Sequence, residues 1–226
     1  MMKTVYRDRH DAGKRLAELL SAYAHHPDVL ILALPRGGVP VAYEVARTLN
    51  VPLDVFIVRK LGVPGHEELA LGAIASGGIR VLNYDVIRAL HIPEQVVEEI
   101  AAREQRELER REQIYRDGRP APDVSGRTVI LIDDGLATGA TMHAALRALR
   151  QQQPARLIAA VPVAAPSTCL ELIGEADDII CALRPDPFFA VGLWYQNFEP
   201  TSDQEVHDLL VQVAQGQHIQ SRHQNA

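Results

Sequence analysis

The sequence predicts an α/β protein built on one doubly wound, mostly parallel sheet. Uninterrupted apolar runs recur along the chain, amphipathic segments with helical spacing separate them, and turn residues gather where the runs end. Runs without polar alternation suit strands that helices cover on both faces. The strands expected are Val29–Leu34, Pro52–Val58, Val129–Ile132, Arg156–Val163 and Asp178–Leu183, with a shorter one at Ile79–Asn83.

The length of 226 residues fits one domain spanning 1–226, with its core at about 29–198. A net charge of −6 argues against nucleic acid as a partner, because non-specific binding to phosphates needs a basic surface. No apolar run approaches the roughly 20 residues that span a bilayer. The N-terminus is charged where a signal peptide is apolar, so we expect a soluble, cytoplasmic protein. Cys169 and Cys181 lie in apolar patterns and are expected to be buried free thiols.

Helices are expected around these strands at 11–23, 39–49, 93–117, 167–175 and 202–214. The helix at 93–117 is long and rich in Glu–Arg pairs at i, i+4 spacing, and its apolar positions are sparse. Such a helix either docks along one narrow stripe with its other faces in solvent, or contributes to a dimer contact. The helix at 202–214 has Ser202 and Glu205 at capping-box spacing.

The most informative stretch is Arg127 to Arg150. A buried strand, Val129–Ile132, leads into Asp133 and Asp134, then into the loop 135–141 with the sequence GLATGAT, and then into a helix. A helix start offers unpaired N–H groups, glycine lets an anion approach closely, and Thr138 and Thr141 add hydroxyl donors. This combination predicts a phosphate site.

The two aspartates need a different ligand group, because they would repel a phosphate. Carboxylates accept hydrogen bonds from neighbouring sugar hydroxyls and also bind divalent cations. A ribose 5-phosphate with Mg²⁺ satisfies both halves of the loop. The alternative is an ordinary strand-to-helix turn with two solvated aspartates. A P-loop is excluded by the lack of GKS or GKT, and no strand is followed by GxGxxG.

Basic and glycine residues follow the first two expected strands. Pro35-Arg36-Gly37-Gly38 combines a tight turn with a guanidinium that suits phosphate, although a structural turn would read the same way. Arg59 and Lys60 follow Pro52–Val58. The carboxyl ends of parallel strands are where open α/β sheets bind ligands. Solvated surface charges are the alternative.

The glycine-rich segment Leu61–Gly78 is too long for a tight connection, so we expect a mobile lid or a hairpin. His66 and Glu67 lie where they could reach the site on closure. The run His66-Glu67-Glu68-Leu69-Ala70 lacks the second histidine of HExxH, which argues against zinc.

All thirteen residues of Val129–Thr141 resemble the phosphoribosyl pyrophosphate (PRPP) loop of the type I phosphoribosyltransferases. The resemblance extends over about Val29 to Phe198. The loop is the motif specific to the family, and the PRGG turn and the glycine-rich segment Leu61–Gly78 support the same resemblance. It implies the α/β fold of that family with a flexible glycine-rich loop, and it marks the helix at 93–117 as an insertion. A homodimer is expected from the family and from this spare helix.

The resemblance also implies residue roles. Asp133 and Asp134 would hold the ribose hydroxyls, and they would lie next to Mg²⁺ that bridges the ribose and the pyrophosphate. Ala137, Thr138, Gly139, Ala140 and Thr141 would bind the 5-phosphate. Pyrophosphate would meet Arg36, Gly37, Gly38, Arg59 and Lys60.

The acceptor is left open. Phe188, Phe189, Trp194 and Tyr195 belong to an aromatic segment resembling the base-stacking region of the family, with Phe189 the best match, although these rings could simply roof the core. Hypoxanthine and guanine enzymes of the family carry an aspartate at the position of Ala137, so the resemblance implies no base within this loop. We expect transfer of phosphoribose to a nucleobase or amine, as in nucleotide and nucleoside metabolism. The alternative is a regulatory protein that senses PRPP or a nucleotide without catalysis.

Overall fold

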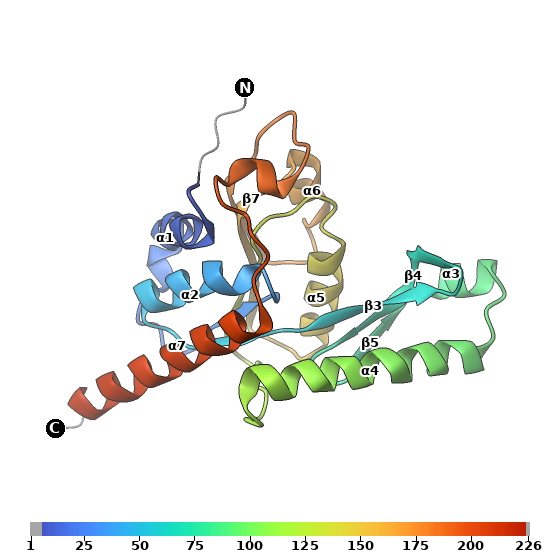
Figure 1. The fold of residues 1–226 in the computed structure, drawn as a ribbon, viewed down its shortest axis with the longest axis horizontal. Helices are drawn as coiled ribbons and strands as arrows, with labels where there is room; N and C mark the ends of the chain where they lie inside the picture. Colours follow the sequence, from blue (N-terminus) through green and yellow to red (C-terminus); the bar gives the residue numbers. More distant parts are fainter. Residues whose placement is uncertain (1–5, 225–226) are drawn as a thin grey trace.

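The computed structural model describes residues 6–224, apart from the side chains of residues 67–68 and 216–224. Five parallel strands form the central sheet, in the order β2-β1-β6-β7-β8 (Figure 1). Their bounds are β1 Val29–Ala33, β2 Leu53–Val55, β6 Thr128–Ile132, β7 Arg156–Val163 and β8 Asp178–Leu183. The predicted doubly wound parallel sheet is confirmed.

Helices cover both faces of this sheet. Helices α1 (Arg9–Leu19) and α2 (Gly38–Leu49) pack on one face, and α5 (Ala140–Gln151) and α6 (Pro166–Glu171) pack on the other. Alternate residues of one strand therefore enter different cores: Ile130 and Ile132 join α1 and α2, whereas Val129 and Leu131 join α5. Short 3₁₀ turns lie at Ser21–Tyr23 and Val191–Trp194. Burial on both faces explains why these strands read as continuous apolar runs.

A second, antiparallel sheet projects to one side of the central sheet (Figure 1). It consists of β3 (Val58–Val63), β4 (His66–Ala75) and β5 (Ile79–Leu82), and α3 (Tyr84–Ala89) and α4 (Glu94–Arg116) accompany it. Gly65, Gly77 and Gly78 take positive φ at its turns, which explains the glycine content of the segment. Of the two alternatives for Leu61–Gly78, the hairpin is the one observed. Helix α3 was not predicted.

The prediction of one strand over Pro52–Val58 is wrong. Strand β2 ends at Val55, and the chain then leaves the parallel sheet to begin β3 at Val58. The crossing is held by Ile57, whose N–H donates to the Ser76 hydroxyl at 2.9 Å and whose carbonyl accepts from Ser76 N–H at 2.8 Å. Val55, Phe56 and Ile57 are buried, so one apolar run continues from β2 to the start of β3 in a different sheet.

The long helix α4 buries a narrow stripe within its own chain, as the docked-helix alternative predicts. Its buried residues are Val97, Ile100, Ala101, Leu108, Tyr115 and Arg116. The last of them, Arg116, donates to Asp54 Oδ1 at 2.9 Å, Glu112 Oε1 at 2.7 Å and the Val55 carbonyl at 2.8 Å, which ties the helix to β2. Helix α7 (Asp203–Gln224) also packs on α4 and extends past the predicted end at residue 214.

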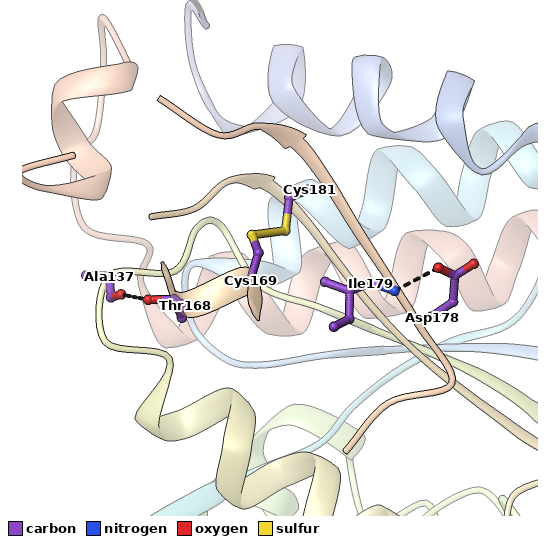
Figure 2. The surroundings of a disulfide bond; sticks show 6 residues. All are labelled: Ala137, Thr168, Cys169, Asp178, Ile179 and Cys181. Atoms are coloured by element: carbon purple, nitrogen blue, oxygen red, sulfur yellow. Dashed lines mark hydrogen bonds between the residues drawn. A yellow bond between two sulfur atoms is a disulfide. The ribbon is translucent and has the colours of Figure 1, made fainter. Parts of the chain in front are cut away.

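The expectation of free thiols is wrong. Cys169 in α6 and Cys181 in β8 form a disulfide that joins this helix to the edge strand (Figure 2). Each cysteine lies in an apolar pattern, and only the packing of α6 on the sheet brings the two sulfur atoms together. Within residues 6–224, no helix is long and apolar enough to cross a membrane.

Candidate functional site

Two loops meet at the carboxyl edge of the central sheet, because β1 and β6 are parallel neighbours. One loop carries Asp133 and Asp134 after β6, and the other carries Gly37 and Gly38 at the start of α2. A Cβ atom at Gly37 would collide with Asp134 Oδ2, and one at Gly38 would lie 2.7 Å from the Ile132 carbonyl oxygen. The paired glycines therefore make room for the acidic loop.

The acidic pair is held by three hydrogen bonds. Asp134 N–H donates to Asp133 Oδ1 at 2.8 Å, Arg9 Nε donates to Asp134 Oδ2 at 2.8 Å, and the Tyr195 hydroxyl donates to the Asp134 carbonyl at 2.6 Å. Asp133 Oδ2 and Asp134 Oδ1 accept no hydrogen bond from the described part of the chain. The site thus keeps one oxygen of each carboxylate available, which is what a diol needs.

Burial raises the pKa of both carboxyl groups. The pKa of Asp133 is well above its ordinary value because the group is desolvated and lies beside the charge of Asp134. The pKa of Asp134 is also raised by burial, although the hydrogen bond and charge of Arg9 act in the opposite direction. A cation or hydroxyl donor entering this site would stabilise the charged forms.

The loop after the pair is anchored on one side and open on the other. Buried Leu136 donates its N–H to the Val163 carbonyl at 2.9 Å and accepts from Ala165 N–H at 3.0 Å. Gly139 takes φ 68° as the N-cap of α5, and His143 N–H donates to its carbonyl at 2.9 Å. Thr138 and Thr141 are exposed, and the first N–H groups of α5 have no partner within the helix. This geometry suits an anion.

Thr168 supports the loop from behind. Its hydroxyl donates to the Ala137 carbonyl, and a Cβ atom on Gly139 would lie 2.6 Å from its methyl carbon (Figure 2). The pattern around Thr168 gave no indication of this role, because the two segments are about thirty residues apart in sequence. The N-terminal Arg9 was missed for the same reason.

Arg36 lies at the same edge, after a cis peptide bond from Pro35. Its side chain is 47% exposed and comes within 3.9 Å of Asp203 Oδ1 at the start of α7. Tyr115, near the end of α4, donates its hydroxyl proton to the same carboxylate oxygen at 2.6 Å. The long helix and the C-terminal helix therefore meet behind the PRGG turn.

Arg59 and Lys60 do not follow a parallel strand, contrary to the prediction. They lie inside β3, paired with Ile74 and Ala73 of the hairpin. Arg59 is held by Glu104 of α4 at 2.6 Å. Lys60 lines a cavity of about 570 Å³ between the hairpin, α3 and α5, together with Ala140 and Thr141. Arg36, Asp133 and Asp134 do not line that cavity.

The hairpin tip carries His66, which is exposed at the start of β4. The side chain of Glu67 lies outside the described residues. No hydrogen bond or ion pair in the described part of the chain joins His66 to the acidic loop.

The aromatic segment divides into buried and exposed rings. Tyr195 is 5% exposed and stacks on Phe198 at 4.9 Å between ring centroids, so its ring belongs to the wall behind Asp134. Phe188 and Trp194 are partly buried against the same cluster. Phe189 is 68% exposed, and among the four rings first considered for the acceptor it is the one most open to a ligand.

No group of three or more His, Cys, Asp or Glu side chains among the described residues could hold a metal ion. Asp133 and Asp134 alone offer two carboxylates. A magnesium ion here would need further oxygen ligands from a bound phosphate, which is how Mg²⁺ usually binds.

Most of the chain matches a known domain. The family model described as "Phosphoribosyl transferase domain" matches residues 4–196. The chain belongs to the phosphoribosyl transferase domain family. The matched region contains the acidic pair, the loop 135–141, the PRGG turn and Arg9.

Similar proteins are found in Mycobacterium tuberculosis and Thermus thermophilus. Two proteins of Mycobacterium tuberculosis, from strains CDC 1551 and H37Rv, are each named "Putative phosphoribosyl transferase" and are 45% identical to this chain over 202 residues. The match covers 89% of this chain and 45% of each relative, so the chain spans about half their length. The crystal structure of the protein TT1426 from Thermus thermophilus is 42% identical, with a TM-score of 0.81, and the match covers 92% of this chain and 98% of that one.

Proposed function

We propose that the chain binds PRPP with Mg²⁺ and transfers its 5-phosphoribosyl group to a nitrogen nucleophile, either a nucleobase or an amine. The observation that carries this proposal is the placement of two part-free carboxylates directly before an open helix N-terminus. Membership of the phosphoribosyl transferase domain family supports the same assignment.

Each part of the site takes one part of this ligand. The free oxygens of Asp133 and Asp134 accept the ribose hydroxyls, and the loop Ala137–Thr141 with the first N–H groups of α5 binds the 5-phosphate. Arg36 of the neighbouring loop would bind the pyrophosphate end, for which its side chain has to turn away from Asp203, 3.9 Å away. Lys60 lines the cavity that Ala140 and Thr141 also line, and from there it would contact the pyrophosphate.

In the proposed reaction, the bond between ribose C1 and the pyrophosphate oxygen breaks, and its electron pair leaves with pyrophosphate. The lone pair of the acceptor nitrogen forms the new bond to C1, and the proton of that nitrogen leaves. Ala137 provides no base within the loop, so this proton goes to water or to a group outside it. Bound Mg²⁺ would supply positive charge to the departing pyrophosphate. The chain itself contributes position and fixed charge.

Binding is tested by thermal unfolding with and without millimolar Mg²⁺ and PRPP. We expect PRPP to raise the melting temperature of the natural chain, and the Asp133→Asn, Asp134→Asn double variant to lose this shift. Asp28→Asn is the matched control, because Asp28 is an exposed aspartate at the opposite end of the sheet, just before β1. An unchanged melting curve of the natural chain would contradict PRPP binding.

Catalysis is tested separately by incubating the protein with Mg²⁺, PRPP and a panel of nucleobases and amines while pyrophosphate release is followed. Release that depends on one acceptor supports the transferase. Tight PRPP binding with no release for any acceptor would favour the sensor alternative.

A further inference from the structure

Arg9, the first residue of α1, makes three contacts with two other parts of the chain. Its Nε donates to Asp134 Oδ2 at 2.8 Å, and one terminal nitrogen donates to the Glu199 carbonyl at 2.7 Å. Its guanidinium carbon lies 3.9 Å from the centroid of the Phe198 ring. One side chain thus joins the N-terminal helix, the acidic loop and the segment that leads into α7.

The Arg9–Asp134 pair is largely shielded from water. The exposed fractions of the two side chains are 11% and 15%, which is far lower than for most ion pairs on this surface. A Cβ atom on Gly37 would lie 3.3 Å from Arg9 Nε, so the guanidinium also lies against the PRGG turn. Arg9 therefore sits where the two site loops approach each other.

The contact fixes which oxygen of Asp134 is left for a ligand. Arg9 occupies Oδ2, whereas the backbone N–H of Asp134 occupies Oδ1 of Asp133. Without Arg9, the Asp134 carboxylate would have no charged partner and could rotate about its side-chain bonds. It would also repel Asp133 more strongly, because both groups are buried.

We propose that Arg9 is a positioning residue for the ribose site, acting through Asp134. Its Nε holds the carboxylate with Oδ1 toward the ligand, and its stacking on Phe198 connects the 198–199 segment to the acidic loop. This inference rests on the proposed binding of PRPP and adds a residue whose role the sequence pattern did not reveal.

A purely structural ion pair would show the same contacts, so the test needs a binding readout. The probe is Mg²⁺ with PRPP, and the dissociation constant is measured by calorimetry alongside the melting temperature of the ligand-free protein. Arg9→Ala is expected to weaken binding about 10- to 100-fold, by analogy with the loss of groups that orient metal-binding side chains. Arg9→Lys keeps the charge beside Asp134 and is expected to recover part of this loss.

Arg127→Ala is the matched control. Arg127 is partly buried and donates to the Val29 carbonyl at 3.0 Å, which ties β6 to β1 at the opposite end of the sheet. This variant is expected to unfold at a lower temperature and to bind the probe as the natural chain does. If Arg127→Ala weakened binding as much as Arg9→Ala, the effect would be one of general stability and the proposal would be overturned.

A double-mutant cycle with Asp134→Asn tests the route of the effect. If Arg9 acts through Asp134, then Arg9→Ala changes binding less than about twofold once Asp134 is Asn. If the double variant lost affinity by the product of the two single-variant factors, Arg9 would act elsewhere and the proposal would be overturned. A natural chain that binds while Arg9→Ala binds equally well contradicts only the role of Arg9. A natural chain that does not bind contradicts the proposed function itself.

Discussion

Thr168 donates its hydroxyl proton to the Ala137 carbonyl, and the residue that follows it, Cys169, is disulfide-bonded to Cys181 (Figure 2). The backbone of the candidate phosphate loop is therefore hydrogen-bonded to α6, and α6 is linked covalently to the edge strand β8. The loop rests on a neighbouring helix as well as on its own strand and helix.

Replacing Thr168 by Val keeps its shape and removes the hydroxyl donor. We expect the unfolding free energy to fall by about 1 kcal/mol, because the Ala137 carbonyl loses its partner. Affinity for PRPP, measured by calorimetry, should fall about 3- to 10-fold as the loop loosens. Thr168→Ser retains the hydroxyl and should bind normally. Equal affinities for the Val and Ser variants would contradict support of the loop by this bond.

Reduction of the disulfide should destabilise the fold. The Cys169–Cys181 bond closes a short loop, and a cross-link of this length is worth about 3 kcal/mol in the chain-entropy model. The Cys169→Ser, Cys181→Ser variant and the reduced natural chain should therefore melt at similar, lower temperatures. Mass spectrometry after alkylation checks the bond directly. Quantitative alkylation of both thiols in the unreduced native protein would contradict it.

Arg116→Met should cost about 3–5 kcal/mol of unfolding free energy. The Arg116 side chain is 4% exposed, and its loss leaves the Asp54 carboxylate in β2 without its charged partner, although burial already raises the pKa of that carboxyl. The measurement is chemical denaturation. Adding Asp54→Asn to Arg116→Met should recover part of the loss, since it removes the unpaired charge. A cost no greater than that of the exposed Arg103→Met would refute this role.

His207 should make stability depend on pH. Its hydrogen bonds to Asp117 and then to Asp208 raise its pKa above the ordinary value of 6.5. Because the folded pKa is the higher one, the contribution is fully present below about pH 6.5 and is lost as pH rises through the folded pKa. The contact is near the surface, so its size is below about 1 kcal/mol. Unfolding free energies of the natural chain and His207→Gln should differ more at about pH 5.5 than at about pH 9, and a difference independent of pH would contradict the assignment.

Local sequence patterns were enough to predict the central sheet and to single out the acidic pair and the loop 135–141 as a candidate site. Strands such as Val129–Ile132 are buried on both faces, so composition and turns mark them. The acidic pair and the loop 135–141 are contiguous in sequence, so a phosphate and ribose site could be proposed without a structure. The docked stripe of α4 followed from helical spacing in the same way.

The predictions that proved wrong, and the residues that were missed, depend on contacts between segments distant in sequence. Val58 belongs to a different sheet from Val55, because a hydrogen-bonded pair with Ser76 turns the chain. That turn moved Arg59 and Lys60 into a hairpin. Arg9 reaches Asp134 across 125 positions of sequence, and no spacing rule predicts such a pair. The disulfide likewise arises from packing.

The central claim is that Asp133 and Asp134 form the ribose half of a PRPP site. Calorimetric titration of PRPP in the presence of Mg²⁺ tests it most directly. The account predicts one binding event per chain for the natural protein and for Asp28→Asn, and no measurable heat of binding for Asp133→Asn, Asp134→Asn. Equal binding by the double variant would contradict the claim.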